Sequence, residues 1–344
     1  MALVLVICLL TGCAEKVGEF HINRKIVCEV DGEPISFDDY KYFFYSHYVS
    51  LYGEDFSALT DEKYNKVKAL TEDSLRRRSF IYGLCDEYGI ELSDDDKEKV
   101  NYYVSEQIDE QGSEANYKAY LLKNRLTGAV FRSQIELTFF YDPYLRDLLI
   151  TGIDGLVPMT DEAIIADVSG GGFYRYAQIY FSVDEGESDR EAYGKISVAY
   201  EKLQGGMAFA DVANATWGVG DERVKYKSEW KVDAAAGAYV AKGEKELILE
   251  NAVLALEENA YSEPIWSGIG WHIFIRLPID TEYVKQNLYT PVTGEKNIAE
   301  QSFARRYLEY IATESEDIKI EYAKYFEKNV SFSMLLKEEK LKEK

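Results

Sequence analysis

Cysteine is scarce in this chain, with only 4 among its 344 residues. So few thiols cannot build the disulfide framework that stabilises many small secreted domains. Cys8 and Cys13 lie in an apolar segment at the N-terminus, which leaves Cys28 and Cys85 for the folded body. Either a single bridge between these two or a pair of buried free thiols fits the sequence.

Histidine is equally scarce, with 3 in the whole chain. His21 lies in a polar spacer, His47 in a helical pattern and His272 in a strand-like run, so their spacing does not resemble a metal site. The run Gly170–Gly172 lacks the strand and helix that flank a phosphate-binding loop, and is interpreted as a hinge. The sequence therefore predicts no metal and no cofactor.

Basic residues are outnumbered, because 39 lysines and arginines face 61 acidic residues and give a net charge of -22. A surface that binds phosphates needs clustered lysine and arginine, so nucleic acid is excluded as a partner. The run Arg76–Arg78 is interpreted as a solvated helix face. The acidic balance favours solubility and repels an anionic membrane surface.

Long hydrophobic runs are missing as well. The segment Ala2–Thr11 is almost wholly apolar, but it is far shorter than the roughly 20 residues that a helix needs to cross a bilayer core. Residues 1–12 are therefore predicted to be a signal peptide, although no lysine or arginine precedes the apolar run. The alternative is a buried N-terminal strand.

The residues Leu10-Thr11-Gly12-Cys13 resemble a bacterial lipobox. This resemblance implies that Cys13 becomes the lipidated first residue of the mature protein. Two acyl chains on one cysteine hold a soluble body at a membrane stably. The protein is therefore expected outside the cytoplasm, lipid-anchored to the outer face of a bacterial cell membrane.

Apolar periodicity predicts a mainly helical α+β fold. A strand at 25–30 and a turn at 31–34 lead into a helix that Ser36 caps together with Asp39. Ser93 is predicted to cap a later helix, and Pro143 to kink or split the last one. Helices are predicted at residues 37–51, 61–88, 94–110, 115–124 and 129–150.

A change of pattern after Gly170–Gly172 predicts an inserted α+β unit. Residues 173–181 alternate with the period of a strand, 192–203 have one apolar helical face, and 262–275 form a closing strand. A tail helix then resumes near residue 304 and is expected to pack on the N-terminal helices. The predicted boundaries are 13–168 for an N-terminal helical domain, 173–280 for the insert and 281–344 for the C-terminal helical segment.

Three motifs carry a family resemblance: Val27–Ser36, Leu203–Ala213 and Ser262–Ile273. Together they resemble the PrsA-like and SurA-like extracytoplasmic foldases. The resemblance implies a helical chaperone domain, similar to the N-terminal domain of SurA and built from both chain ends, with an inserted parvulin domain. It also implies peptidyl-prolyl cis-trans isomerase (rotamase) activity, with unfolded or partly folded secreted polypeptides as partners, and it leaves a homodimer open.

The parvulin pocket implied by this resemblance is only partly kept. His272 matches the second family histidine and Ser267 the pocket hydroxyl, while Gln178 stands where the first histidine is expected. The remaining pocket positions fall at Val219, Lys245, Leu249 and Trp271. Such a pocket accelerates rotation about an X-Pro bond, whose barrier is about 18–20 kcal/mol, by favouring the twisted amide. The alternative for His272 is a satisfied core residue.

Three functions remain open from the sequence. The first is a membrane-tethered foldase with isomerase activity, and the second is a holdase of the same build that has lost catalysis. The 28 tyrosines support the second, because tyrosine offers apolar area with a polar tip, although helix packing explains most of them. The third is a lipid-anchored solute-binding protein, which would need two lobes of alternating strands and helices.

Overall fold

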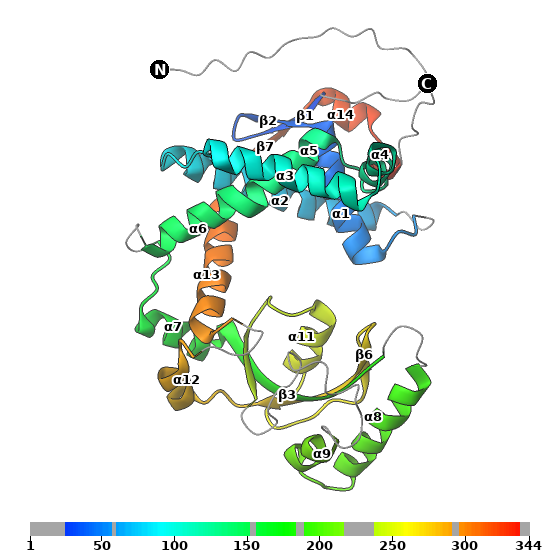
Figure 1. The fold of residues 1–344 in the computed structure, drawn as a ribbon, viewed down its shortest axis with the longest axis vertical. Helices are drawn as coiled ribbons and strands as arrows, with labels where there is room; N and C mark the ends of the chain where they lie inside the picture. The colour runs from blue at the N-terminus through cyan, green and yellow to red at the C-terminus, as the bar shows by residue number, and fades with distance from the viewer. Residues whose placement is uncertain are drawn as a thin grey trace. The chain divides into compact units, whose positions relative to one another are not determined.

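The computed structural model describes residues 25–56, 60–151, 156–183, 189–216, 237–290 and 296–337 (Figure 1). The chain divides into two compact units. One, called here the terminal unit, contains the described residues up to Asp147 and those from Ile311 onward. The other, the central unit, runs from Leu148 to Tyr310. The domain boundaries given above and the residues before 25, Cys13 among them, stay at the level of prediction.

The terminal unit is mainly helical and carries one small antiparallel sheet. The sheet has the strand order β2-β1-β7, so the C-terminal strand pairs with the N-terminal one, Cys28 opposite Tyr322. Its strands are β1 (Ile26–Val30), β2 (Glu33–Ser36) and β7 (Ile320–Tyr322). Its helical elements are α1 (Phe37–Tyr52), α2 (Asp61–Glu87), α3 (Asp94–Glu110), α4 (Glu114–Lys123), α5 (Gly128–Glu136), the π-helix η1 (Leu137–Tyr141), α14 (Lys324–Asn329), α15 (Phe332–Leu336) and the first part of α6 (Asp142–Thr151), which passes into the central unit at Leu148.

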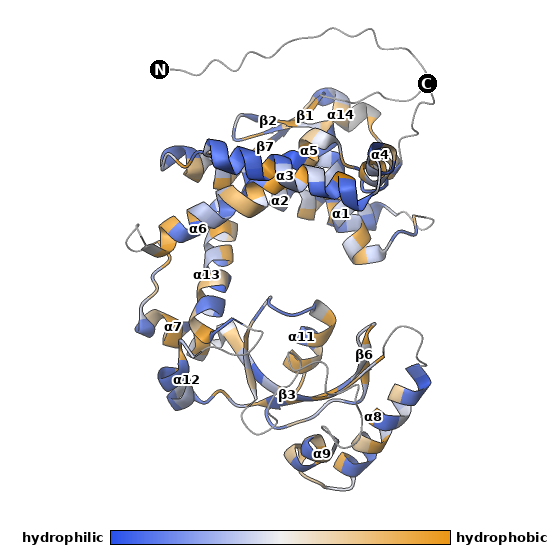
Figure 2. Cartoon of the chain, in the orientation of Figure 1, coloured by the Kyte–Doolittle hydropathy of each residue, from blue (hydrophilic) through white to orange (hydrophobic). Residues whose placement is uncertain are grey.

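Local capping chemistry sets several helix starts. The Ser36 side chain accepts from the backbone N–H of Asp39, as predicted, and Ser93 and Asp96 form a reciprocal capping box. The helices show hydrophobic and hydrophilic faces side by side (Figure 2), which is typical of helices with one face on a core. That core includes Tyr40 and Leu335 from opposite ends of the chain.

The expected kink at Pro143 takes a specific form. Proline has no N–H to donate to the carbonyl four residues earlier, and the turn ahead of it is a π-helix, η1. The N–H of Asp142 donates to Leu137, five residues back. The predicted helix over 129–150 is therefore a continuous run of α5, η1 and α6.

The central unit contains a four-stranded antiparallel sheet in the order β4-β3-β6-β5. Its strands are β3 (Phe173–Ser182), β4 (Ala238–Ala241), β5 (Ile265–Trp266) and β6 (Gly270–Leu277). Its helical elements are α7 (Asp161–Asp167), η2 (Val168–Gly172), α8 (Asp189–Gln204), α9 (Phe209–Thr216), α11 (Leu247–Leu254), α12 (Thr281–Asn287) and α13 (Ile298–Ser315), whose last turn belongs to the terminal unit. The mainly helical α+β class is confirmed.

Each face of the central sheet carries its own core. Ala177 and Ile273 pack against α8 and α9 on one face, whereas Tyr176 and Phe274 pack toward α11 on the other. The prediction of one strand over 262–275 is wrong in one respect. The chain turns back between β5 and β6 at Gly268, whose φ of +90° suits glycine.

Both cysteines of the folded body are free and buried, which confirms the free-thiol alternative. Burial raises the pKa of Cys28 and of Cys85 to about 12, so both remain protonated thiols at neutral pH. Among the described residues, no helix is both long enough and apolar enough to cross a membrane.

Candidate functional site

Strand pairing brings three of the predicted site residues together. On β3 and β6, Tyr180 lies opposite His272, so Gln178 and His272 are on one face of the sheet. The Nδ1 atom of His272 is 3.2 Å from Oε1 of Gln178. Its Nε2 is 2.9 Å from Oγ of Ser267, which lies at the turn between β5 and β6. The structure thus places Gln178, His272 and Ser267 in one hydrogen-bonded chain.

This cluster is buried. His272 is 0% exposed and Gln178 is 2% exposed, while Ser267 is only partly covered. The imidazole stacks between Tyr180, at 4.4 Å between ring centroids, and Phe274, at 5.3 Å. Burial lowers the pKa of His272 to about 4, because the surroundings solvate a charged ring poorly. The ring is therefore neutral at physiological pH.

A neutral imidazole carries one N–H, which restricts the direction of the hydrogen bonds. With Oε1 of Gln178 facing it, Nδ1–H donates to Gln178, and Nε2 is left as an acceptor. The single proton of the Ser267 hydroxyl is then shared between this Nε2 and the carbonyl of Gly270, which is 3.2 Å from Oγ. Both ring nitrogens are then used within the protein. The arrangement fixes the ring firmly, and it leaves Ser267 as the member nearest to solvent.

The other predicted pocket residues are more dispersed. Leu249 on α11 packs in the same cluster as Phe274, and Lys245 is half-buried in the segment that precedes α11. Trp271 lies on the opposite face of the sheet from its neighbour His272, 4.8 Å from the ring of Tyr193. Val219 lies outside the described residues. In the described part of the chain, no group of three histidine, cysteine or acidic side chains is placed as metal ligands would be.

A second candidate site, which the sequence did not indicate, is a cavity of about 330 Å³ in the terminal unit. We call it the aromatic groove. It is lined by α1, the end of α4, α5 and η1. None of its lining residues is acidic or basic, although 29% of the chain is charged. The lining residues are Tyr42, Tyr45, Ser46, Tyr120, Asn124, Leu126, Phe131, Gln134, Ile135, Thr138 and Phe139.

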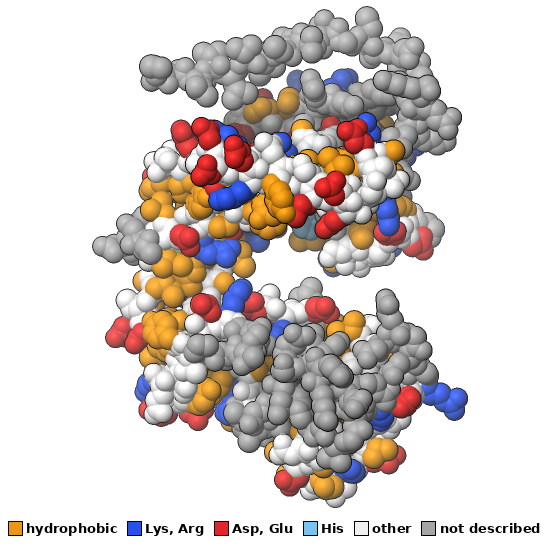
Figure 3. Space-filling view, viewed as in Figure 1, with side chains coloured by type: hydrophobic (Ala, Val, Ile, Leu, Met, Phe, Trp, Pro, Cys, Tyr) orange, Lys and Arg blue, Asp and Glu red, His pale blue; other side chains and the backbone are white. Residues whose placement is uncertain are grey.

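The π-helix shapes one wall of the aromatic groove. Thr138 and Phe139 belong to η1, and the Phe139 side chain is 52% exposed. Its ring stacks on Tyr103 of α3 at 5.0 Å between centroids. Hydrophobic side chains therefore reach the surface of this unit among charged ones, as Figure 3 shows. Short π-helical segments are frequent at functional sites.

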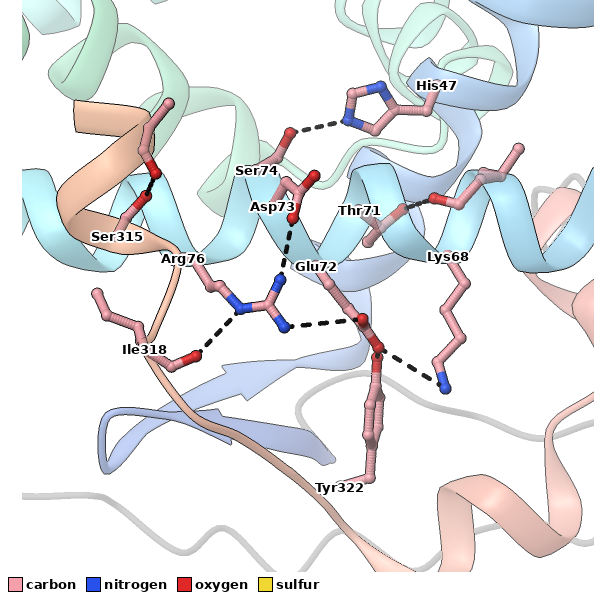
Figure 4. A network of polar contacts seen from close by, with 12 residues as sticks. His47, Lys68, Thr71, Glu72, Asp73, Ser74, Arg76, Ser315, Ile318 and Tyr322 are labelled. Atoms are coloured by element: carbon pink, nitrogen blue, oxygen red, sulfur yellow. Dashed lines mark hydrogen bonds and ion pairs between the residues drawn. The ribbon is translucent and has the colours of Figure 1, made fainter. Parts of the chain in front are cut away.

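A polar network fastens the C-terminal segment to α2 (Figure 4). The Tyr322 hydroxyl donates to Glu72 at 2.8 Å, and Nε of Arg76 donates to the carbonyl of Ile318 at 3.0 Å. Lys68 completes the charge balance around Glu72, 3.7 Å away. Desolvation raises the pKa of Tyr322. These contacts form a structural joint, and Arg76 also lines a polar cavity of about 250 Å³ between α2 and the end of α13.

Comparison with known proteins gives matches among solved structures alone. No family model matches the chain, and no curated protein matches it. PrsA from Bacillus subtilis matches at 15% identity and a TM-score of 0.28, covering 76% of this chain and 90% of that one. PrsA from Streptococcus pneumoniae matches at 15% identity and a TM-score of 0.31, with 76% and 85% covered. A SurA-like chaperone of Campylobacter jejuni matches at 12% identity and a TM-score of 0.28, with 88% and 100% covered.

The solved structures that this chain resembles thus include PrsA foldases and SurA-like chaperones. At such low identities and TM-scores these likenesses carry no argument about function.

Proposed function

We propose that this protein is a chaperone that holds unfolded secreted polypeptides outside the cytoplasm, tethered to the membrane through lipid on Cys13. The observation that carries the proposal is the uncharged, aromatic lining of the groove. Unfolded chains expose apolar side chains next to main-chain amides. Aromatic rings supply contact area for the former, and Ser46, Asn124 and Thr138 supply hydrogen bonds for the latter.

The size and charge of the protein suit this role. A cavity of about 330 Å³ accommodates one or two large side chains and not a folded domain. The net charge of -22 keeps a complex with an aggregation-prone chain in solution through mutual repulsion. A solute-binding protein is less well supported, because both sheets of the described residues are antiparallel and not parts of two α/β lobes.

Suppression of aggregation tests the proposal. Chemically denatured citrate synthase is diluted into buffer with and without the full chain, and light scattering is followed. We expect suppression by the unchanged protein and its loss in Phe139→Ser, which removes an exposed ring from the groove. Val198→Ser on α8 is the matched control, because Val198 is 51% exposed and lies in the other unit. The proposal fails if the unchanged protein does not suppress scattering.

Peptidyl-prolyl isomerisation is the second candidate, and the convergence of Gln178, Ser267 and His272 favours it. Catalysis needs hydrogen bonds that favour the twisted amide in a site that a proline ring can enter. The Ser267 hydroxyl is the group best placed to meet a substrate. In a proline-peptide assay, activity in the unchanged protein that disappears in Ser267→Ala supports isomerisation. Absence of activity in the unchanged protein supports a holdase, which binds unfolded chains without catalysis.

The tether is tested separately by fractionating cells. Cys13→Ala should release the protein from the membrane fraction, while Cys8→Ala, within the proposed signal peptide, should leave it bound. Membrane association of Cys13→Ala would show that the lipobox interpretation is wrong.

A further inference from the structure

Two polar groups beside the aromatic groove are buried without a hydrogen-bond partner among the described residues. They are Nε2 of Gln134 and the hydroxyl of Tyr117. Folding removes such a donor from water without replacing the lost hydrogen bonds, which costs stability. Native proteins contain few groups of this kind, so each of them calls for an explanation.

The position of Gln134 supplies the explanation. It lines the groove from α5, in line with Phe131 one turn before it and Thr138 one turn after it. The neighbouring charged groups of α5 are engaged elsewhere. Arg132 contacts both Glu136 and Asn101, so neither Arg132 nor Glu136 serves the Gln134 amide. Nε2 is shielded in the free protein, and because Gln134 lines the groove, a turn of its side-chain amide brings this unused donor to an occupant.

We propose that Gln134 recognises a carbonyl oxygen of the bound polypeptide, donating from Nε2 while a large apolar side chain of the same segment lies among the aromatic rings. This inference rests on the proposed function and names the substrate class, which is a neutral, extended segment. A carboxylate is disfavoured, because the lining has no cation to balance a desolvated charge. The carbonyl is the neutral acceptor that every residue of an unfolded chain carries.

A glutamine that keeps a hydrogen-bond donor free for a ligand differs from one that stabilises the fold in how its replacement changes the melting temperature and the binding affinity. Replacing it with an apolar side chain of similar length removes an unpaired polar atom from the free protein, and removes a bond from the complex. Gln134→Met should therefore raise the melting temperature and weaken binding at the same time. A glutamine that stabilised the fold would give a lower melting temperature.

The experiment uses the full chain and a neutral heptapeptide probe, acetylated and amidated, with one central tryptophan among glycine and serine. Binding is measured by calorimetry and unfolding by thermal denaturation. We expect Gln134→Met to bind about tenfold more weakly, the effect of one lost hydrogen bond, and to melt at a higher temperature. Gln107→Met on α3 is the control, because the Gln107 amide already donates to Glu110 at 2.9 Å. It should match the unchanged protein.

The outcomes separate the inference from the proposed function. Suppose that the unchanged protein binds the probe and that Phe139→Ser weakens binding while Gln134→Met does not. The groove is then the binding site, and the proposed role of Gln134 is wrong. A lower melting temperature for Gln134→Met overturns it as well. If the unchanged protein suppresses scattering but does not bind the probe, the inferred substrate class is wrong and the proposed function stands; if it does neither, both proposals fail. The probe with glutamate in place of tryptophan should not bind, and binding of it would contradict the neutral substrate class.

Discussion

The side-chain amide of Gln301 completes the outer edge of strand β4, where its Oε1 accepts from the backbone N–H of Ala241 at 3.0 Å. Its Nε2 donates to the carbonyl of Tyr239 at 3.3 Å. The buried side chain of Gln301 thus makes two of the backbone hydrogen bonds that a neighbouring strand would make. Unpaired sheet edges invite pairing with other chains, so this contact protects the central unit from association through β4.

Gln301→Ala should lower the free energy of unfolding by about 1–3 kcal/mol, because it leaves two backbone groups of β4 buried without partners. It should also increase aggregation during refolding. Urea unfolding and light scattering measure the two effects. Gln204→Ala at the exposed end of α8 should change the free energy by less than about 0.5 kcal/mol. Equal stability of the two variants would contradict the edge-protecting role.

Gly172→Ala should destabilise the central unit for a steric reason. A Cβ atom at this position would lie 2.1 Å from Oδ1 of Asp167 and 2.7 Å from Nε of Arg305, which pair with each other. We expect a loss of about 1–3 kcal/mol, as for other overpacked sites. Gly170→Ala is the matched control, because its Cβ would meet nothing within 4 Å. Thermal denaturation compares the two, and similar melting temperatures would refute the prediction.

Acid should weaken the central unit through His272. Burial lowers its pKa from 6.5 to about 4, so between these values the unfolded chain takes up a proton that the folded one does not. Stability is therefore complete above pH 6.5 and falls as the pH is lowered toward 4, by about 3 kcal/mol in all. All 4 tryptophans lie between Trp217 and Trp271, so tryptophan fluorescence in urea reports this unit. His272→Gln should flatten the pH dependence in that window, and an unchanged slope would contradict the assignment.

Tyr322→Phe should loosen the joint between β7 and α2. The change removes the hydroxyl that donates to Glu72 at 2.8 Å and lies 3.3 Å from the Tyr40 hydroxyl. We expect a loss of about 1–2 kcal/mol and faster proteolysis of the C-terminal segment. Tyr325→Phe should cost less, because its bond to the Ile26 carbonyl is exposed to water. Mass spectrometry of limited digests compares the two, and equal digestion rates would count against the prediction.

Local sequence signals predicted the parts of the fold that local chemistry decides. The alternation from Phe173 onward marked β3, and the apolar positions from Ala192 to Leu203 are buried along α8. The caps lie where they were predicted, at Ser36 with Asp39 three residues later and at Ser93. Each of these depends on residues within a few positions along the chain.

Features that depend on distant residues were not accessible in this way. Strand β4 is short, and it exists through its pairing with β3 and the cover from Gln301. The aromatic groove gathers helix faces whose packing no single periodicity specifies. The sequence indicated His272, Gln178 and Ser267 as partners and left a satisfied core residue open for His272, but the choice between the two depends on the packing of Tyr180 and Phe274 around the ring.

The pairing of β1 with β7 has a consequence for the order of events during synthesis. Arg125, between α4 and α5, donates to the carbonyl of Leu336 from Nη2 at 2.6 Å. Helix α15 is therefore bonded to the loop that carries the lining residues Asn124 and Leu126. The central unit is contiguous in sequence, whereas the terminal unit closes only after the segment from Ile311 onward has been made. Closing so long a loop is slow. A chain that leaves the ribosome N-terminus first therefore presents the whole central unit before the segment that closes the terminal unit has emerged.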